Sequence, residues 1–168
     1  MKILILLRHA KSSWSNNQIL DHKRDISKIG LAQIQKLKLF MNEKKYIPDF
    51  IYTSDSNRAL KTLNNLKKSF PNLKKKTKIK KSKKMYLIDE ILMKSIISNT
   101  SNDYKKVMII NHEPCIRALL FSLINKKDKI LNNLLFSIPA SSIFVLVSKK
   151  SSWENIKEGD FKLVDFQN

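Results

Sequence analysis

The sequence predicts an α/β fold, a three-layer α/β/α sandwich with a mainly parallel central sheet. Short continuous aliphatic runs recur along the chain, and such runs are typical of strands that are buried on both faces. Between them lie longer segments in which apolar residues recur at helical spacing. Strands that alternate with helices in this way favour a parallel sheet covered by helices on both faces.

The first predicted strand is Lys2–Leu7, and a polar loop over 11–27 follows it. Ser27 suits the N-cap position, because its hydroxyl can accept a hydrogen bond from a backbone N–H of the first helical turn. Leucine, isoleucine and methionine at helical spacing then predict a helix over 28–44. The next predicted elements are a strand over 49–53 and a helix over 57–69.

The second half of the chain continues the alternation. A lysine-rich segment is predicted as an exposed loop and a weak strand that ends near Leu87. Pro114 fits the first turn of a helix. Trp14 and Trp153 are expected in the core, since large aromatic side chains bury much apolar area. The other predicted elements are helices over 89–98 and 116–124 and strands over 107–110, 142–147 and 161–166. No internal repeat or domain break interrupts them, so we expect one domain over 1–168.

The chain is strongly basic, with 33 Lys and Arg against 14 Asp and Glu and a net charge of +19. Such a charge attracts polyanions, yet the abundance of Lys, Ile and Asn resembles a genome-wide bias. No aromatic residue interrupts the densest lysine cluster before Tyr86, so bases have no stacking platform there. We therefore expect no specific nucleic-acid partner. The cluster comprises Lys74, Lys75, Lys76, Lys78, Lys80, Lys81, Lys83 and Lys84.

Composition also indicates in which cellular compartment the protein is expected. No apolar stretch approaches the roughly 20 residues that a membrane helix needs. The N-terminal apolar run ends at Arg8, which is too short for a signal peptide, and it lacks a small-residue cleavage site. The single cysteine, Cys115, allows no internal disulfide and fits a reducing compartment. We expect a cytoplasmic protein with no membrane partner.

Polar residues follow three of the predicted buried strands. Arg8 and His9 end the first strand, and His112 ends the strand over 107–110. Thr53 and Ser54 end the strand over 49–53, and Arg58 comes in the first turn of the next helix. In open α/β sheets, ligands bind outside the carboxyl ends of the strands. If these three strands are neighbours, two arginines and two histidines converge.

That combination favours phosphoryl chemistry. Guanidinium groups offer paired planar donors that match phosphate oxygens. One imidazole can act as a nucleophile toward phosphorus while the other, protonated, stabilises the transferring group; the residues alone leave open which histidine attacks. His22, in a polar loop, is expected to be an ordinary hydrogen-bonded residue. The sequence contains no metal-ligand spacing, no glycine-flanked nucleophilic serine and no phosphate-binding P-loop.

These residues resemble motifs of the histidine phosphatase superfamily, also called phosphoglycerate mutase-like, and of its small SixA-type phosphohistidine phosphatases. The similarity extends in order along the chain, which implies a phosphoglycerate mutase-like fold. The segments that carry it are LLRHAKSSW over 6–14, DHKRDI over 21–26 with Gly30, YTSDSNRALKT over 52–62, NHEP over 111–114 and IPASS over 138–142.

The resemblance implies a role for each matching residue. His9 is then the nucleophile that becomes phosphorylated, and Arg8, Arg58 and His112 bind and polarise the phosphoryl group. Arg24 joins them as a phosphate ligand. The resemblance also implies that no metal and no organic cofactor is needed. It further implies a monomer that removes phosphate from phosphohistidine in a protein or from a small phosphorylated molecule.

Two departures from the family pattern lie beside the second histidine. Asn111 replaces the usual Gly and Glu113 the usual Asn. Larger members of the family use a carboxylate as proton donor to the leaving oxygen, and here the candidates are Asp89, Glu90 and Glu113. Besides a phosphohistidine phosphatase, the sequence therefore leaves two alternatives. One is a phosphatase of small esters or anhydrides, and the other is a non-catalytic polyanion-binding module that would bind with steep salt dependence.

Overall fold

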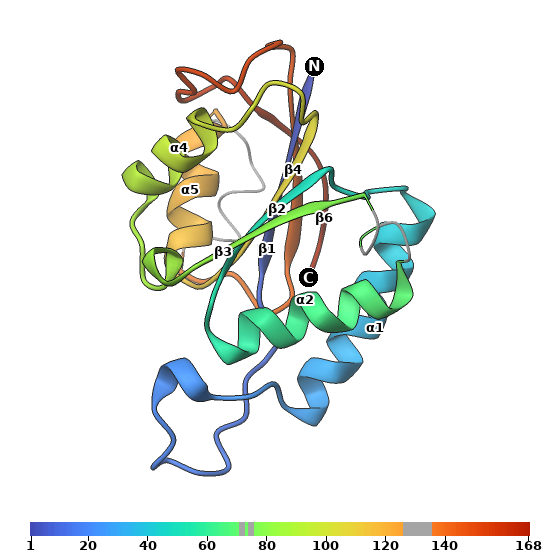
Figure 1. Cartoon of the computed structure of the whole chain (residues 1–168), viewed down its shortest axis with the longest axis vertical. Coiled ribbons are helices and arrows are strands. Elements are labelled where there is room, and N and C mark those ends of the chain that lie inside the picture. Colours follow the sequence, from blue (N-terminus) through green and yellow to red (C-terminus); the bar gives the residue numbers. More distant parts are fainter. Residues whose placement is uncertain (71–72, 74–75, 126–135) are drawn as a thin grey trace.

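The computed structural model describes residues 1–70, 73, 76–125 and 136–168, and a six-stranded sheet lies at its centre (Figure 1). The strand order is β3-β2-β4-β1-β5-β6. The first four strands in this order are mutually parallel. β5 is antiparallel to β1, and β6 is antiparallel to β5, so the predicted mainly parallel sheet is confirmed. The strands are β1 (Lys2–Arg8), β2 (Phe50–Ser54), β3 (Lys78–Ser82), β4 (Lys106–Asn111), β5 (Ile143–Ser148) and β6 (Lys162–Gln167).

Helices cover both faces of this sheet, which confirms the three-layer architecture. Figure 1 shows α1 and α2 on one side of the strands and α4 and α5 on the other. None of the helices in the described ranges is long and apolar enough to cross a membrane. The helices are α1 (Lys28–Glu43), α2 (Asn57–Ser69), α4 (Glu90–Ser98) and α5 (Cys115–Leu123), with short 3-10 turns η1 (Asp21–Lys23) and η2 (Lys83–Met85).

The aliphatic runs have a direct structural cause. Along β1, Leu4 and Leu6 pack into the core under α4 and α5, whereas Ile5 and Leu7 pack into the core under α1 and α2. Successive side chains of a strand point to opposite faces, so a strand buried on both faces must be apolar at every position. β4 obeys the same rule and is buried from Val107 onward.

Most predicted boundaries agree with the structure to within one or two residues. Ser27 caps α1, and its hydroxyl accepts a hydrogen bond from the backbone N–H of Gly30 at 3.1 Å. Asp89 caps α4 by accepting from the N–H of Leu92 at 2.7 Å. Pro114 stands at the N-cap of α5, immediately before its first helical residue, Cys115.

The lysine-rich segment forms an edge of the sheet. β3 pairs only with β2 in the described part of the chain, and η2 continues from it. The lysines of β3 and η2 are exposed, and none of them makes an ion pair with a described residue. Lys74 and Lys75 lie outside the described residues. Charged side chains on an open edge discourage pairing with a second sheet.

The two tryptophans differ in their burial. Trp153 is fully buried and donates its indole N–H to the carbonyl of Tyr104 at 2.8 Å, as expected for a core residue. Trp14 was expected in the core as well, and this expectation is wrong: its exposed fraction is 63%. The loop after β1 carries Trp14 outward, away from both packed faces of the sheet.

We predict that Gly30→Ala destabilises the fold, although alanine normally favours a helix. A Cβ at Gly30 would lie 2.4 Å from the carbonyl oxygen of Lys11. That oxygen accepts hydrogen bonds from the N–H and the hydroxyl of Ser27, so it cannot easily move away. We expect a loss of about 2 kcal/mol, typical of an overpacked site, in urea-induced unfolding. Leu31→Ala, at an exposed neighbour in the same helix, is the control and should change little; a Gly30→Ala variant as stable as the wild type would contradict the prediction.

Candidate active site

The strands β2, β4 and β1 are neighbours, and their carboxyl ends meet at one edge of the sheet, which is the condition under which the sequence predicted a common site. Arg8 pairs with Asn111 in register, and Thr53 pairs with Ile110. The backbone N–H of His9 continues this pairing and donates to the carbonyl of Asn111 at 3.0 Å. The polar residues that follow the three strands are thereby held side by side.

Two histidines and one arginine form the centre of this group. The ring centroids of His9 and His112 are 4.8 Å apart, and the Nε of Arg58 lies 3.1 Å from the Nε2 of His9. All three side chains are almost fully buried. The structure therefore brings together the predicted residues from three separate segments of the chain.

The contacts of His9 determine where its proton lies. Nδ1 is 2.7 Å from the carbonyl oxygen of Ala10, which can only accept, so Nδ1 carries the hydrogen. Nε2 then has a free lone pair, and the Nε–H of Arg58 donates to it. Both contacts select the same neutral tautomer, whose Nε2 is nucleophilic.

Thr62 connects the loop of His9 to the helix of Arg58. Its hydroxyl accepts a hydrogen bond from the N–H of Ala10 at 3.0 Å and donates to the carbonyl of Arg58 at 2.7 Å. This buried hydroxyl explains why the segment that supplies Arg58 also contains a threonine four residues later: it fixes α2 against the end of β1.

His112 lies against two serine hydroxyls. Its Nε2 is 3.0 Å from the Oγ of Ser54 and 3.2 Å from the Oγ of Ser56. Its Nδ1 is buried and has no hydrogen-bond partner among the described residues. A neutral imidazole that accepts a hydrogen bond at Nε2 carries its proton on Nδ1, where that proton is available to an incoming anion.

Burial keeps both imidazoles neutral in the free protein. It is the main cause that lowers the pKa of His9 to about 4, and the positive charges of Arg58 and Arg8 lower it further. Burial also lowers the pKa of His112 to about 2, with further contributions from His9 and Arg58. An anion bound between these groups would act in the opposite direction and favour protonation of an imidazole.

Asp21 joins this group from the loop before α1. Its Oδ2 accepts hydrogen bonds from the Nη2 of Arg58 at 2.8 Å and from the hydroxyl of Tyr86 at 2.5 Å. Burial by itself raises the pKa of Asp21, but the hydrogen bonds from Tyr86 and Arg58 outweigh it, so the pKa is lowered. The ring of Tyr86 stands edge-on to His112, with centroids 5.3 Å apart. Asp21 is therefore an ionised anchor for Arg58.

The two remaining predicted arginines border the site. Arg8 donates from Nη1 to the carbonyl of Ile138, and its Nε is buried without a partner among the described residues. Arg24 is buried, and its Nε lies 3.7 Å from Asp21. Arg24 thus reaches the shared carboxylate, and no contact joins it directly to either histidine of the centre. His22 pairs with Asp55 at 2.7 Å, as expected of an ordinary hydrogen-bonded residue.

The sequence departures have local explanations. The side-chain oxygen of Asn111 accepts from the N–H of His112 at 2.9 Å and so fixes the backbone of that histidine. Glu113 accepts from the Nε of Arg117 at 2.7 Å. Of the other acid candidates, Asp89 caps α4 and Glu90 is the first residue of that helix. Within the described chain, none of these three carboxylates is hydrogen-bonded to His9 or His112.

An open cavity of about 410 Å³ begins at the site. Arg8 and His9 line it together with Lys11, Trp14 and Gln33. Gln33 of α1 bridges its two sides: its Oε1 accepts from the N–H of Lys11 at 3.0 Å, and its Nε2 donates to the carbonyl of Ala140 at 3.1 Å.

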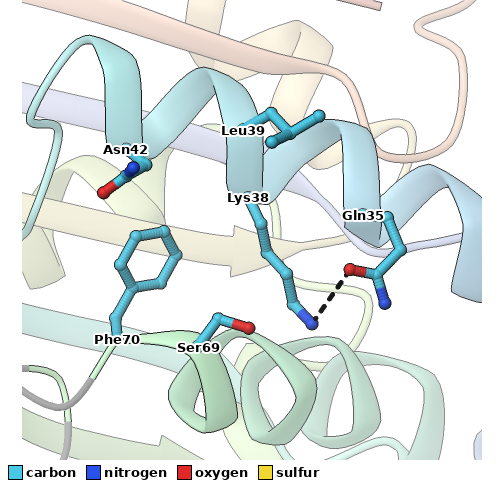
Figure 2. Close-up of a pocket in the computed structure, with 6 residues that line it drawn as sticks. All are labelled: Gln35, Lys38, Leu39, Asn42, Ser69 and Phe70. Carbon is cyan, nitrogen blue, oxygen red and sulfur yellow. Dashed lines mark hydrogen bonds between the residues drawn. The ribbon is translucent and has the colours of Figure 1, made fainter.

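A second cavity, of about 360 Å³, lies between α1 and the end of α2 (Figure 2). Figure 2 shows Lys38 donating to Gln35 within it, at 3.4 Å, and Phe70 opposite Asn42. None of the predicted site residues lines this cavity, so we do not assign it to the reaction.

Other kinds of site find little support. Among the residues that the structure describes, no group of three or more His, Cys, Asp and Glu side chains could hold a metal ion. Burial raises the pKa of Cys115 to about 12, which keeps its thiol protonated and unreactive at neutral pH.

Sequence analysis missed Asp21, Tyr86 and Ser56 as parts of the site. Asp21 opens the DHKRDI segment, so a signal for it was present, but its contact with Arg58 depends on how the loop folds back. Tyr86 follows the lysine cluster, where nothing in the pattern marks it. Ser56 reads simply as the residue before a helix, yet its hydroxyl faces His112.

Comparison with protein families and curated sequences gives a consistent result. A family model described as histidine phosphatase superfamily (branch 1) matches residues 4–80, the segment that contains Arg8, His9 and Arg58. An uncharacterised chloroplastic protein of Arabidopsis thaliana is 40% identical over 63 residues, which are 38% of this chain. The matched stretch spans only 29% of that relative's length.

Solved structures resemble the whole chain. The candidate phosphohistidine phosphatase SixA of Agrobacterium tumefaciens is 23% identical with a TM-score of 0.81, covering 99% of this chain and 97% of its own. The protein histidine phosphatase SixA in complex with tungstate is 16% identical with a TM-score of 0.76, covering 98% and 95%. A phosphoserine phosphatase of Entamoeba histolytica is 14% identical with a TM-score of 0.66, covering 100% and 98%.

The fold is therefore phosphoglycerate mutase-like, and it is similar to that of SixA proteins. The segment that carries Arg8, His9 and Arg58 matches the model of the histidine phosphatase superfamily (branch 1), so the chain resembles that superfamily both in this segment and in its fold. The fold and family resemblance stated from the sequence are both confirmed.

We predict that the free energy of unfolding falls as the pH drops from about 6.5 toward 4. In this window an unfolded histidine, with a pKa of about 6.5, binds a proton that the folded His9 does not bind, so acid favours the unfolded state. Each such histidine contributes a slope of up to about 1.4 kcal/mol per pH unit. Urea unfolding between pH 4.5 and 7.5 should show this slope, and His9→Asn should reduce it. His112→Asn should also reduce the slope, and its effect should extend to lower pH because the pKa of His112 is lower than that of His9. An unchanged slope in both variants would contradict the lowered pKa values of these histidines.

Proposed function

We propose that the chain is a phosphatase that forms a covalent phosphohistidine intermediate on His9, with phosphohistidine in proteins as its preferred substrate. The observation that carries the proposal is the neutral His9 tautomer: its Nδ1–H is held by Ala10, and its Nε2 lone pair lies 3.1 Å from the guanidinium of Arg58. A nucleophile toward phosphorus needs such a lone pair beside a group that neutralises the phosphoryl oxygens.

In the first step, Nε2 of His9 attacks the phosphorus of the donor, and a new P–N bond forms as the old P–N bond breaks. Arg8 and Arg58 bind the phosphoryl oxygens, and Arg58 must release Nε2 for this. His112, through the Nδ1 that has no described partner, donates to another oxygen. The electron pair of the broken bond goes to the donor's ring nitrogen. A donor imidazole protonated at its other nitrogen leaves as neutral imidazole.

In the second step, water attacks the phosphorus of the intermediate. The P–Nε2 bond breaks, its electron pair returns to His9, and inorganic phosphate leaves with the water's oxygen. No metal or organic cofactor is part of this proposal, because the two arginines supply the positive charge, and His112 a hydrogen-bond donor, for the phosphoryl oxygens.

The proposed preference for phosphohistidine rests on the acid that the site provides. The carboxylate that contacts Arg58 is Asp21, and its pKa is lowered, so it is ionised at neutral pH and does not donate a proton. Glu113 accepts from Arg117 through Oε1, and its Oε2 is buried without a hydrogen-bond partner among the described residues. No hydrogen bond joins Glu113 to His9 or His112 in the described chain. An alkoxide leaving group needs protonation by such an acid, whereas the imidazole of phosphohistidine leaves without one.

A phosphatase of small esters or anhydrides is the second candidate. It is favoured by the fold similarity to a phosphoserine phosphatase. It is also favoured by a carboxylate at the site, that of Asp21, which is a candidate proton donor to the leaving oxygen. It requires Asp21 to bind a proton against the pull of Arg58 and Tyr86.

The partner is proposed to be a phosphorylated protein rather than a nucleic acid or a membrane. Exposed lysines on β3 and η2 lie at the edge of the sheet that includes the end of β2, where Ser54 pairs with Ser82. They can steer an acidic phosphoprotein toward the site. A buried free thiol suits a reducing compartment, so a cytoplasmic location is part of the proposal. The monomeric state is also proposed, and it rests on the family resemblance alone.

We predict that purified protein mixed with phosphoramidate carries a phosphate on His9, detectable by mass spectrometry without acid treatment. His9→Ala should form no adduct and release no phosphate, because it lacks the nucleophile. Arg58→Ala should form the adduct at least about 100-fold more slowly, as expected for loss of a charge-stabilising group. His22→Asn is the control, because this variant keeps His9 and should carry the phosphate on His9 as the wild type does. Normal turnover by a folded His9→Ala variant would refute the mechanism.

We predict that the wild type hydrolyses phosphohistidine at least about 100-fold faster, in kcat/KM, than phosphoserine, because general acid catalysis is missing for the ester. Phosphate release from both substrates at pH 7 measures the ratio. Comparable rates would favour the small-ester phosphatase. In that case Asp21→Asn should abolish phosphoserine turnover while the adduct with phosphoramidate still forms.

A further inference from the structure

Trp14 is exposed at the mouth of the active site. Its exposed fraction is 63%, although the chain buries its other tryptophan completely. It lines the 410 Å³ cavity that also contains Arg8 and His9. A large aromatic side chain kept in water beside a reactive group is available to contact a ligand.

The indole ring is held in place from one side. The guanidinium carbon of Arg24 lies 3.9 Å from the ring centroid, a close cation–π contact. Arg24 is buried, and its Nε lies 3.7 Å from Asp21, which also accepts from Arg58. The loop itself is fixed where the N–H of Ser13 donates to Asp25 at 2.8 Å. The ring is therefore a rigid surface linked to the catalytic groups.

The cavity holds more than a phosphoryl group. Its volume falls in the range of sites for whole small molecules. Trp14, Pro139 and Ala140 supply apolar wall, and the polar lining comes from Arg8, His9, Lys11, Ser12 and Gln33. The cavity therefore offers apolar surface, beside the polar groups, to the part of the substrate that bears the phosphoryl group.

We propose that Trp14 is a specificity-determining residue on which the planar ring of the leaving group stacks. The substrate class is then a donor whose phosphoryl group is attached to an aromatic ring nitrogen, such as the imidazole of phosphohistidine. Aliphatic amines and ammonia have no flat face for this contact. The inference deepens the proposed phosphatase function and rests on it.

Two donors with the same P–N chemistry test the proposal. N-phosphoimidazole has a planar leaving group, and phosphoramidate releases ammonia. Trp14→Ala should lower kcat/KM for N-phosphoimidazole roughly three- to tenfold, the size of a lost aromatic stacking contact, and leave phosphoramidate within about twofold. Trp14→Phe should restore most of the loss, whereas Trp14→Leu, which is apolar but not flat, should not. Leu20→Ala, at an exposed apolar residue of the same loop, is the control and should behave like wild type with both donors.

The outcomes separate this inference from the proposed function. Equal losses with both donors would mean that Trp14 merely supports the loop, and no loss with either would mean that the ring is not contacted; each result overturns the inference. Full recovery by Trp14→Leu would also overturn it, because apolar area alone would then suffice. Failure of the wild type to phosphorylate His9 with phosphoramidate would instead refute the proposed function.

Discussion

The parallel pairing of β4 with both β1 and β2 is the constraint on which the site depends. Because these strands run in the same direction, their carboxyl ends lie at one edge of the sheet, and so do the residues that follow them. Residues separated by about fifty positions along the chain, such as His9 and Arg58, then come within 3.1 Å. The two helical layers bury the strands and thereby bury these side chains as well.

Burial makes the histidines of the site neutral, and it also destabilises the folded state by leaving polar groups unpaired. The desolvation that lowers the pKa of His9 keeps its Nε2 lone pair free at neutral pH. The same desolvation leaves the Nε of Arg8 and the Nδ1 of His112 without partners among the described residues, and unpaired buried polar groups are destabilising. A phosphoryl group would bring oxygens to such donors. The free protein is in this sense organised around an anion that it does not itself supply.

Asp21 connects the residues around His9 to the arginine that contacts the cavity wall. It accepts hydrogen bonds from Arg58 and Tyr86 and lies near Arg24, whose guanidinium stacks on Trp14. A single ionised carboxylate therefore anchors the arginine that contacts His9 and lies within ion-pair distance of the arginine that contacts the cavity wall. Because the pKa of Asp21 is lowered, this carboxylate is an anchor for arginine rather than a proton donor, and the proposed preference for leaving groups that depart without an acid rests on this point.

The sequence by itself determined the layers of the fold, most element boundaries and the convergence of Arg8, His9, Arg58 and His112. It could do so because strands buried on both faces must be continuously apolar, and because polar residues at the ends of such strands are conspicuous. Only the tertiary structure decided the contacts of Asp21 and Tyr86, the tautomer of His9 and the exposure of Trp14. These depend on how loops fold back over the edge of the sheet, and loop paths are set by individual hydrogen bonds between distant residues rather than by any periodic pattern.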